Sequence, residues 1–445
     1  MTTPICDFVR QYRDSDTLRL HMPGHKGKPL LGMEALDLTE IAGADSLYEA
    51  EGIIRESESN ASALFGCPTL YSTEGSSQCI RAMLYLVCLY AAAQGKKPVI
   101  AAGRNAHKTF LSAAVLLDFD LLWLYPEEPD SYLSCRLTPA EVERMLAEKP
   151  VTAVYLTSPD YLGNTVDIAG IAAVCHAHGA LLLVDNAHGA YLRFLPGSAH
   201  PMDLGADLCC DSAHKTLPAL TGAAYLHLGS DLPPVFYEEA KNALAMFGST
   251  SPSYLILQSL DAVNGYLNDG YRDKLAEWIE TVRICREKLT AHGYRFCGDE
   301  PMKLTICAVA YGYRGDELAG ILRSQGMECE FADPDFLVLM ITPETGREGL
   351  CRLTEVLLSL PSRLPAEQKP PRFSLPERVF SPREASFMPR EILPAVQCAG
   401  RVLAAVHTGC PPAVPIAVCG ERIDEGVLAC LRYYGTEECC VVKEI

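Results

Sequence analysis

Lys215 lies in the segment Asp211-Ser-Ala-His-Lys-Thr, directly after Leu208–Asp211, an apolar run that is typical of a buried strand. Ligands of open α/β sheets bind at the carboxyl ends of the strands, where this lysine is expected. A desolvated amine has a lowered pKa, which helps it to act as a nucleophile and base. Lys215 could therefore form an imine with an aldehyde cofactor. Taken alone, the segment is more typical of a lysine in a surface loop.

Asp185 ends a second apolar run, Leu181–Asp185, and is followed by Asn-Ala-His188-Gly. A cofactor with a pyridine ring needs a carboxylate beside the ring nitrogen, which keeps the nitrogen protonated and makes the ring an electron sink. An aspartate in this position can equally be a helix cap or a metal ligand.

Two weaker signals precede Asp185. The segment Ser72-Thr-Glu-Gly75-Ser76-Ser77 opens a helical pattern over Gln78–Leu89. Free backbone N–H groups, hydroxyls and the helix dipole would form a phosphate site there, although an ordinary helix cap explains the segment more simply. His107 follows the predicted strand Pro98–Ala102 and could stack on a planar ring. A lone histidine more often satisfies a local hydrogen bond.

The order and spacing of these four signals are more specific than any one of them. A phosphate loop, a stacking histidine, a strand-end aspartate and a strand-end lysine all fall at strand ends or strand-to-helix turns of one region. Together they favour pyridoxal 5'-phosphate held as a Schiff base on Lys215. They therefore predict an enzyme that acts on an amino acid.

Short apolar runs alternate with helical patterns up to about residue 240, which predicts an α/β fold with a mainly parallel sheet. A long helical pattern over 252–293 and a smaller α+β region follow. We expect an N-terminal arm at 1–30, a large cofactor-binding domain at 31–245, a small α+β domain at 246–360, a proline-rich linker at 361–376 and a C-terminal domain at 377–445. The predicted strands are Pro98–Ala102, Leu121–Tyr125, Val151–Thr157, Leu181–Asp185, Leu208–Asp211 and Ala223–Leu228, and the helices between them include Thr138–Glu148 and Ile168–His178.

Composition excludes several broad classes of protein. The 445 residues are 49% hydrophobic and 21% charged, which suits a globular chain of two or three domains. A net charge of -18 argues against nucleic acid and anionic membrane as partners. The amino terminus does not resemble a signal peptide, and the apolar run Ala82–Ala93 is short for a membrane span, so we expect a cytoplasmic protein. The 19 cysteines show no CxxC spacing, and no metal site is predicted.

The sequence also resembles a known family over nearly its whole length. It is similar to the bacterial ornithine/lysine/arginine decarboxylases of the aspartate-aminotransferase superfamily, in the shorter form without an amino-terminal receiver-like domain. The resemblance is carried most specifically by His21-Met-Pro-Gly-His-Lys-Gly27 and Ser212-Ala-His-Lys-Thr-Leu-Pro218, and further by Asp45-Ser-Leu-Tyr48, Glu51-Gly-Ile-Ile54, Gly75-Ser-Ser77, Asp185-x-Ala-His188-Gly, Ser249-Thr-Ser-Pro-Ser-Tyr254, Lys303-Leu-Thr-Ile306, Glu330-Phe-Ala-Asp333, Ser381-Pro-Arg-Glu384 and Gly420-Glu-Arg-Ile423.

The resemblance implies an aspartate-aminotransferase-like large domain of fold type I. It also implies decarboxylation of a basic amino acid to a polyamine or its precursor, in a homodimer or higher homo-oligomer. Residue roles follow position by position. Lys215 would carry the cofactor, Asp185 would pair with its ring nitrogen, His107 would stack on the ring, His188 would lie beside the ring, Gly75, Ser76, Ser77, Ser212 and His214 would hold the phosphate, and Ser249 and Thr250 would reach the phosphate of a partner subunit.

Four positions depart from the usual pattern of the family. Asn186 stands where the family usually has glutamate, and Glu74 stands where it often has asparagine. Ala50 occupies a position where proline is common, and Asp160 occupies a usual threonine position. They leave the substrate open among arginine, lysine and ornithine. Two alternative functions also remain, since function belongs to the site and not to the fold. One is another pyridoxal phosphate enzyme, an aminotransferase or an aldolase-type lyase. The other is a catalytically silent binding or regulatory relative.

Overall fold

The computed structural model describes residues 1–127, 131–365, 370–372, 375–406 and 410–444. Its largest sheet has seven strands in the order β1-β7-β6-β5-β4-β2-β3. Strands β5 and β6 are parallel, as are β2 and β3, whereas β7 runs antiparallel to both β1 and β6. The predicted α/β fold with a mainly parallel sheet is confirmed. The strands are β1 (Thr69–Ser72), β2 (Val99–Gly103), β3 (Asp120–Leu124), β4 (Ala153–Thr157), β5 (Leu181–Asp185), β6 (Leu208–Asp211) and β7 (Ala224–Leu228).

The six predicted strands all occur. Strands β5 and β6 have the predicted bounds, and the other four begin and end within two residues of the prediction. Five of these strands are buried almost throughout, which explains why their sequences are apolar on both faces, whereas the edge strand β3 is only partly buried. Strand β1 was not predicted, because its four residues begin and end with a polar side chain and give too short a signal.

The chain divides into two compact units. The first unit comprises residues 1–98, 149–155 and 168–276, and the second comprises 99–148, 156–167 and 277–445. Helices of the first unit are α1 (Pro4–Arg13), α2 (Ile53–Phe65), α3 (Ser76–Ala93), α6 (Ile168–Ala177), α7 (Ala213–Thr216), α8 (Pro234–Glu238), α9 (Ala240–Ala245) and α10 (Tyr254–Asn268).

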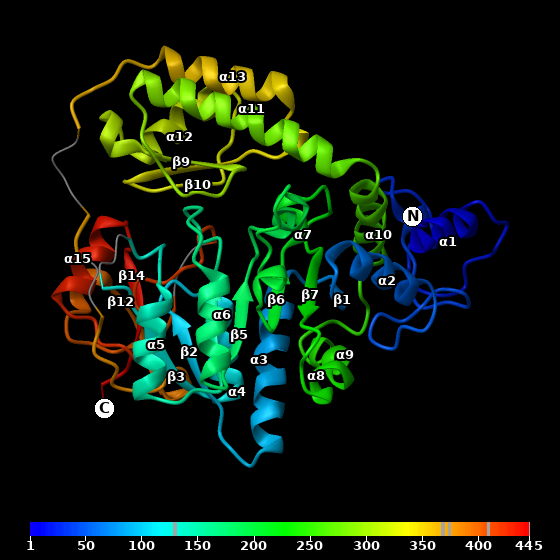
Figure 1. The fold of residues 1–445 in the computed structure, drawn as a ribbon, viewed down its shortest axis with the longest axis horizontal. Helices are drawn as coiled ribbons and strands as arrows, with labels where there is room; N and C mark the ends of the chain where they lie inside the picture. The colour runs from blue at the N-terminus through cyan, green and yellow to red at the C-terminus, as the bar shows by residue number, and fades with distance from the viewer. Residues whose placement is uncertain (128–130, 366–369, 373–374, 407–409, 445) are drawn as a thin grey trace. The chain divides into compact units, whose positions relative to one another are not determined.

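Helix α3 is the core helix of the first unit. It packs against β1, β6 and β7 and is covered on another side by α8 and α9 (Figure 1). Among the described residues it is the one helix long and apolar enough to cross a membrane, but half of it is buried within the protein. Its apolar composition is accounted for by this packing.

The second unit contains a four-stranded sheet in the order β10-β11-β9-β8. Helices α11, α12 and α13 lie over one face of this sheet (Figure 1). The predicted helical pattern over 252–293 is two helices, α10 and α11, because Gly270 adopts a φ of +71° between them. Further elements of the unit are α4 (Lys108–Leu117), α5 (Pro139–Glu148), α11 (Tyr271–His292, entering from the first unit), β8 (Phe296–Cys297), β9 (Lys303–Cys307), α12 (Gly315–Ser324), β10 (Phe331–Ala332), β11 (Phe336–Met340) and α13 (Gly346–Ser359).

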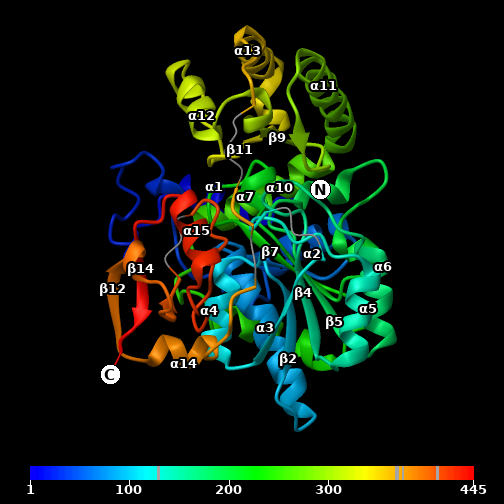
Figure 2. The ribbon, with the colours of Figure 1, turned by 90° about the vertical axis from the view of Figure 1, so that its left-hand side faces the viewer.

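The C-terminal part of the second unit has a three-stranded antiparallel sheet in the order β12-β14-β13. Figure 2 shows α14 and α15 beside it. The predicted domain boundaries remain a prediction, and residues 366–369 and 373–374 of the predicted linker lie outside the described residues. The elements are α14 (Pro382–Phe387), β12 (Arg390–Pro394), β13 (Leu403–Ala405), α15 (Glu425–Tyr433) and β14 (Glu438–Val442).

Candidate active site

The ends of β5 and β6 bring Lys215 and His188 together. The two strands are parallel, and Asp185 of β5 lies opposite Cys210 of β6, so both strands end at the same edge of the sheet. Lys215 lies in the short helix α7, which follows β6, and His188 lies in the turn after β5. Lys215 Nζ is 3.1 Å from His188 Nε2. A lysine amine and a buried imidazole therefore meet at the edge where ligands of such sheets bind.

Asp185 is buried beside this pair. Its Oδ2 accepts a hydrogen bond from the hydroxyl of Tyr155 at 3.0 Å, and its Oδ1 accepts from the N–H of Ala187 at 3.2 Å. The Cys210 thiol lies 3.6 Å from Oδ1. Burial raises the pKa of Asp185, whereas the positive charge of Lys215 and these hydrogen bonds lower it in part. A cation placed next to Asp185 would favour its charged form.

The predicted phosphate loop also lies in the first unit, next to α7. Ser212 Oγ donates a hydrogen bond to Ser76 Oγ at 2.9 Å, which joins the cap of α7 to the first turn of α3. Gly75 has a φ of +72°, and its N–H donates to the carbonyl of Gly222 at 2.8 Å. A Cβ at Gly222 would lie 2.8 Å from the Thr73 carbonyl oxygen, so only glycine permits this approach.

Two further phosphate candidates flank these hydroxyls. Ser77 is half-buried in the first turn of α3. The ring of His214 is oriented by the carbonyl of Ala223, which accepts a hydrogen bond from Nδ1 at 2.9 Å. Because Nδ1 carries the proton, Nε2 is the nitrogen that can gain one and become a second donor. The predicted set of phosphate ligands thus contains hydroxyls, a histidine and a helix N-terminus.

The remaining predicted residues are His107, Ser249 and Thr250. His107 belongs to the second unit, where it caps α4 and its Nδ1 accepts a hydrogen bond from the N–H of Thr109 at 3.2 Å. Ser249 and Thr250 are exposed in the single chain, between α9 and α10. The stacking role of His107 and the role of Ser249 and Thr250 at a partner's phosphate stay predictions.

Sequence reasoning missed Tyr155 and the network around Asp211. Oδ2 of Asp211 lies 3.0 Å from Nε2 of both His200 and His227, and all three side chains are fully buried. Cys209 lies close to His200 and Asp211, so this cluster has donors of the kind that bind metals. Its histidines and carboxylate already bond to one another. The available signal was a charged residue, Asp211, at the end of an apolar strand.

Asp160 and Asn186, two of the residues that differ from the usual pattern of the family, have local structural roles. Asp160 is buried in the second unit, and its Oδ1 accepts hydrogen bonds from the N–H groups of Leu162 and Asn164, both at 2.9 Å. Asn186 donates through its side-chain amide to Asp211 at 2.6 Å. Both side chains stabilise the turns that follow strands β4 and β5.

These features define the fold type I class of pyridoxal phosphate enzymes. The lysine decarboxylase of Francisella novicida has this fold, with a TM-score of 0.81 over 99% of this chain and 81% of that chain, at 17% sequence identity. The predicted fold class is confirmed.

Residues 3–299 match the family model described as the major domain of Orn/Lys/Arg decarboxylase, and the chain belongs to this family. It is 30% identical to the arginine decarboxylase of Halalkalibacterium halodurans over 97% of this chain and 93% of the relative. It is 29% identical to the arginine decarboxylase of Bacillus subtilis, over 95% and 91% of the two chains. The family and these relatives are pyridoxal phosphate-dependent amino acid decarboxylases, which confirms the prediction of such an enzyme.

Proposed function

We propose that this chain decarboxylates a basic amino acid, with pyridoxal phosphate bound at Lys215. The observation that carries the proposal is the placement of Lys215 Nζ 3.1 Å from His188, beside the buried carboxylate of Asp185. Arginine is the first candidate substrate, because the curated relatives with about 30% identity are arginine decarboxylases. Lysine and ornithine are the other two candidate substrates.

The residues of the first unit fit this cofactor. Lys215 supplies the amine for its aldehyde, and Asp185 supplies a buried carboxylate for its ring nitrogen. The hydroxyls of Ser76 and Ser212 meet in front of α3, where the helix N-terminus favours an anion. Gly75 has no side chain, and a Cβ there would come no nearer than 3.9 Å to its surroundings, so the approach to these hydroxyls is open.

Bound pyridoxal phosphate supplies an electron sink for the electron pair left when the substrate carboxylate departs as carbon dioxide. Asp185 keeps the ring nitrogen protonated, which requires its carboxylate to stay charged despite its burial. The Tyr155 hydroxyl and the Ala187 N–H stabilise that charge. His188 accepts a hydrogen bond from Lys215, so the pair can hold a proton and return it to the α-carbon.

The product depends on which basic amino acid is the substrate. Arginine would yield agmatine, and lysine or ornithine would yield a diamine, so the reaction would serve polyamine synthesis. We propose a cytoplasmic homodimer or higher homo-oligomer. Exposed Ser249 and Thr250 would then reach the phosphate site of the neighbouring subunit, and His107 would stack on the cofactor ring.

A decarboxylation assay with arginine, lysine and ornithine tests the proposal. Carbon dioxide and the matching amine should form with at least one of these substrates, and Lys215→Ala should abolish turnover. Lys288→Ala is the matched control, because Lys288 is exposed on α11. Undiminished turnover by Lys215→Ala would refute the role of this lysine. A keto acid formed without carbon dioxide would show a transaminase instead.

A further inference from the structure

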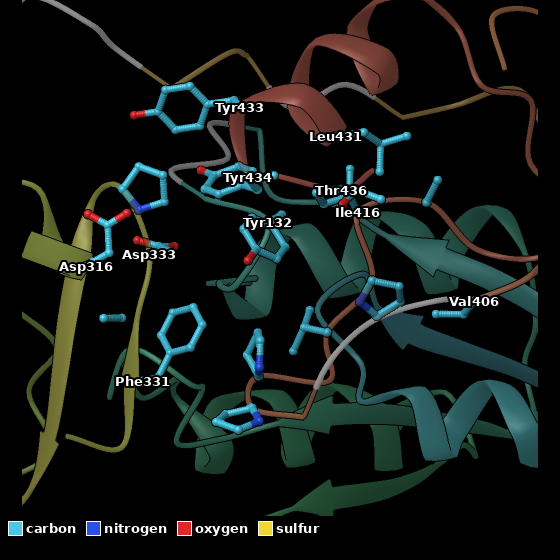
Figure 3. Close-up of a pocket in the computed structure, with 18 of the residues that line it drawn as sticks. Tyr132, Asp316, Phe331, Asp333, Val406, Ile416, Leu431, Tyr433, Tyr434 and Thr436 are labelled. Atoms are coloured by element: carbon cyan, nitrogen blue, oxygen red, sulfur yellow. The ribbon is translucent and has the colours of Figure 1, made fainter. Parts of the chain in front are cut away.

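The second unit contains a cavity of about 530 Å³. Its lining comes from β10 and the turn after it, the start of α12, β13 and the residue Val406 after it, the segment after residue 410, the end of α15, the start of β14, and Tyr132. Figure 3 shows Asp316 and Asp333 on one side, with Tyr132 and Tyr434 across from Asp333. The volume falls within the roughly 300–1,000 Å³ that is usual for small-molecule sites.

Asp333 is the unusual residue in this lining, because it is 7% exposed and only one of its carboxylate oxygens is satisfied. Oδ1 accepts hydrogen bonds from the N–H groups of Asp335 and Phe336 at 2.8 and 2.7 Å. Oδ2 is buried and has no hydrogen-bond partner within the described structure. A buried carboxylate oxygen without a partner is costly, and a cationic ligand would remove that cost.

The charges around the cavity are negative on balance. Asp335 accepts hydrogen bonds from the hydroxyls of Tyr433 and Tyr434 at 2.6 and 2.9 Å, and both of these donors are neutral. Arg314 is the one basic side chain among the described lining residues, and Asp316 binds it in an ion pair of 2.6 Å. The charge of Asp333 is therefore left without a cation.

The rest of the lining is apolar and aromatic. The rings of Tyr132 and Tyr434 lie 4.7 Å apart, and aromatic faces attract ammonium and guanidinium groups. An aliphatic chain would contact the apolar part of the lining, which includes Leu403, Val406, Pro411, Pro412, Val414 and Ile416.

We propose that this cavity binds the ammonium or guanidinium end of an alkyl amine, with Asp333 Oδ2 as its anionic partner. The source of the ligand rests on the proposed function: it is either the basic amino acid or the amine product. Both have the same cationic end and the same aliphatic chain. A neutral molecule of similar length would lack the group that Asp333 binds.

Calorimetric titration with agmatine tests this proposal on the full chain with pyridoxal phosphate. Asp333→Asn keeps the oxygen that accepts from Asp335 and Phe336 but removes the charge. Thr436→Lys is the second variant, because it adds a cation to the lining without changing the turn at Asp333. Both variants should bind agmatine roughly 10- to 100-fold more weakly than the unaltered protein, as expected for loss of a charge-assisted hydrogen bond. Asp273→Asn, the same substitution at an exposed carboxylate, should leave binding unchanged.

Equal agmatine affinity in the unaltered protein, Asp333→Asn and Thr436→Lys would overturn the proposal, as would a complete lack of binding. A raised KM for the amino acid in Asp333→Asn identifies the substrate as the ligand. An unchanged KM with relief of agmatine inhibition identifies the product. If the protein decarboxylates a basic amino acid but both variants bind agmatine as tightly as the unaltered protein, this inference fails and the proposed function stands. If the protein decarboxylates none of the three amino acids but both variants lose agmatine binding, the proposed function fails and this inference stands.

Discussion

The side-chain amide of Asn186 donates a hydrogen bond of 2.6 Å to Oδ1 of Asp211. Asn186 directly follows Asp185, and Asp211 directly precedes Ser212 at the cap of α7. Burial opposes ionisation of Asp211, but His200 and His227 outweigh it and hold the pKa of Asp211 well below its usual range. A carboxylate that stays charged thus joins the two strand ends that carry the proposed catalytic groups.

Asn186→Asp should destabilise the protein strongly. The substitution keeps the size of the side chain but replaces the donor with a second carboxylate 2.6 Å from Asp211. We expect a loss of about 3 kcal/mol or more in the free energy of unfolding at pH 8, because a buried charge then lacks a partner. The loss should shrink at pH 5, where the new carboxyl group can take up a proton and donate again to Asp211.

The control for this prediction is Asn268→Asp, the same substitution at an exposed position of α10. Its free energy of unfolding should change by less than about 0.5 kcal/mol, as is usual for surface substitutions. Equal denaturation midpoints for Asn186→Asp and the unaltered protein would contradict the role given to this bond.

The sequence predicted the parts of this site that depend on strand ends. Asp185 and Lys215 could be found because both follow apolar runs, and those runs end where the structure ends β5 and β6. Tyr155 and His200 could not be found in this way. The contact of Tyr155 depends on which strands are neighbours and on the register between them, and that of His200 depends on the path of the chain before β6. Neither can be derived from local composition. Asp211 was predicted only as the end of a strand.

Tyr155→Phe should lower the rate of decarboxylation. The substitution removes the hydroxyl that donates to Asp185 Oδ2 at 3.0 Å and leaves the ring in place. The pKa of Asp185 is already raised by burial, so its charged form becomes still less favourable without this donor. We expect kcat to fall roughly 10-fold or more, in line with loss of a hydrogen bond to a charged group. Steady-state kinetics across the pH range would measure this.

Tyr225→Phe is the matched control for Tyr155→Phe. Tyr225 is equally buried in the sheet, but its hydroxyl has no hydrogen-bond partner in the described part of the chain. Removal of that hydroxyl should leave kcat unchanged. If both substitutions reduced kcat by the same factor, the effect would belong to the packing of the sheet and not to Asp185.

Ser76→Ala and Ser212→Ala should each weaken the binding of pyridoxal phosphate. Their hydroxyls lie 2.9 Å apart at the start of α3, and each is proposed to donate to the phosphate. A loss of about 10-fold in cofactor affinity is expected for each hydroxyl. Titration followed by absorbance measures this, with Ser59→Ala on the exposed face of α2 as control. Unchanged affinity in both variants would place the phosphate elsewhere.

The stability of the protein should fall as pH rises towards neutrality, in part because of Asp333. Burial, and then the nearby charges of Asp335 and Asp316, raise the pKa of Asp333 to about 7. The unfolded chain loses this proton near pH 4, so between about pH 4 and 7 the folded state alone retains it. The contribution of Asp333 to stability is present below this window and is lost through it. Asp333→Asn should reduce the fall in denaturation midpoint between pH 5 and 8, and an identical pH profile would contradict this.

Mixed dimers test whether Thr250 acts in the site of the partner subunit. Thr250 is exposed in the single chain, and Thr250→Asp would place a negative charge against the partner's phosphate. Lys215→Ala and Thr250→Asp should each be inactive alone. In a mixed dimer one site would carry both changes and the other neither, so subunit exchange should restore about a quarter of full activity at equal mixing. Failure to restore activity, with exchange verified by mass, would show that Thr250 acts within its own chain.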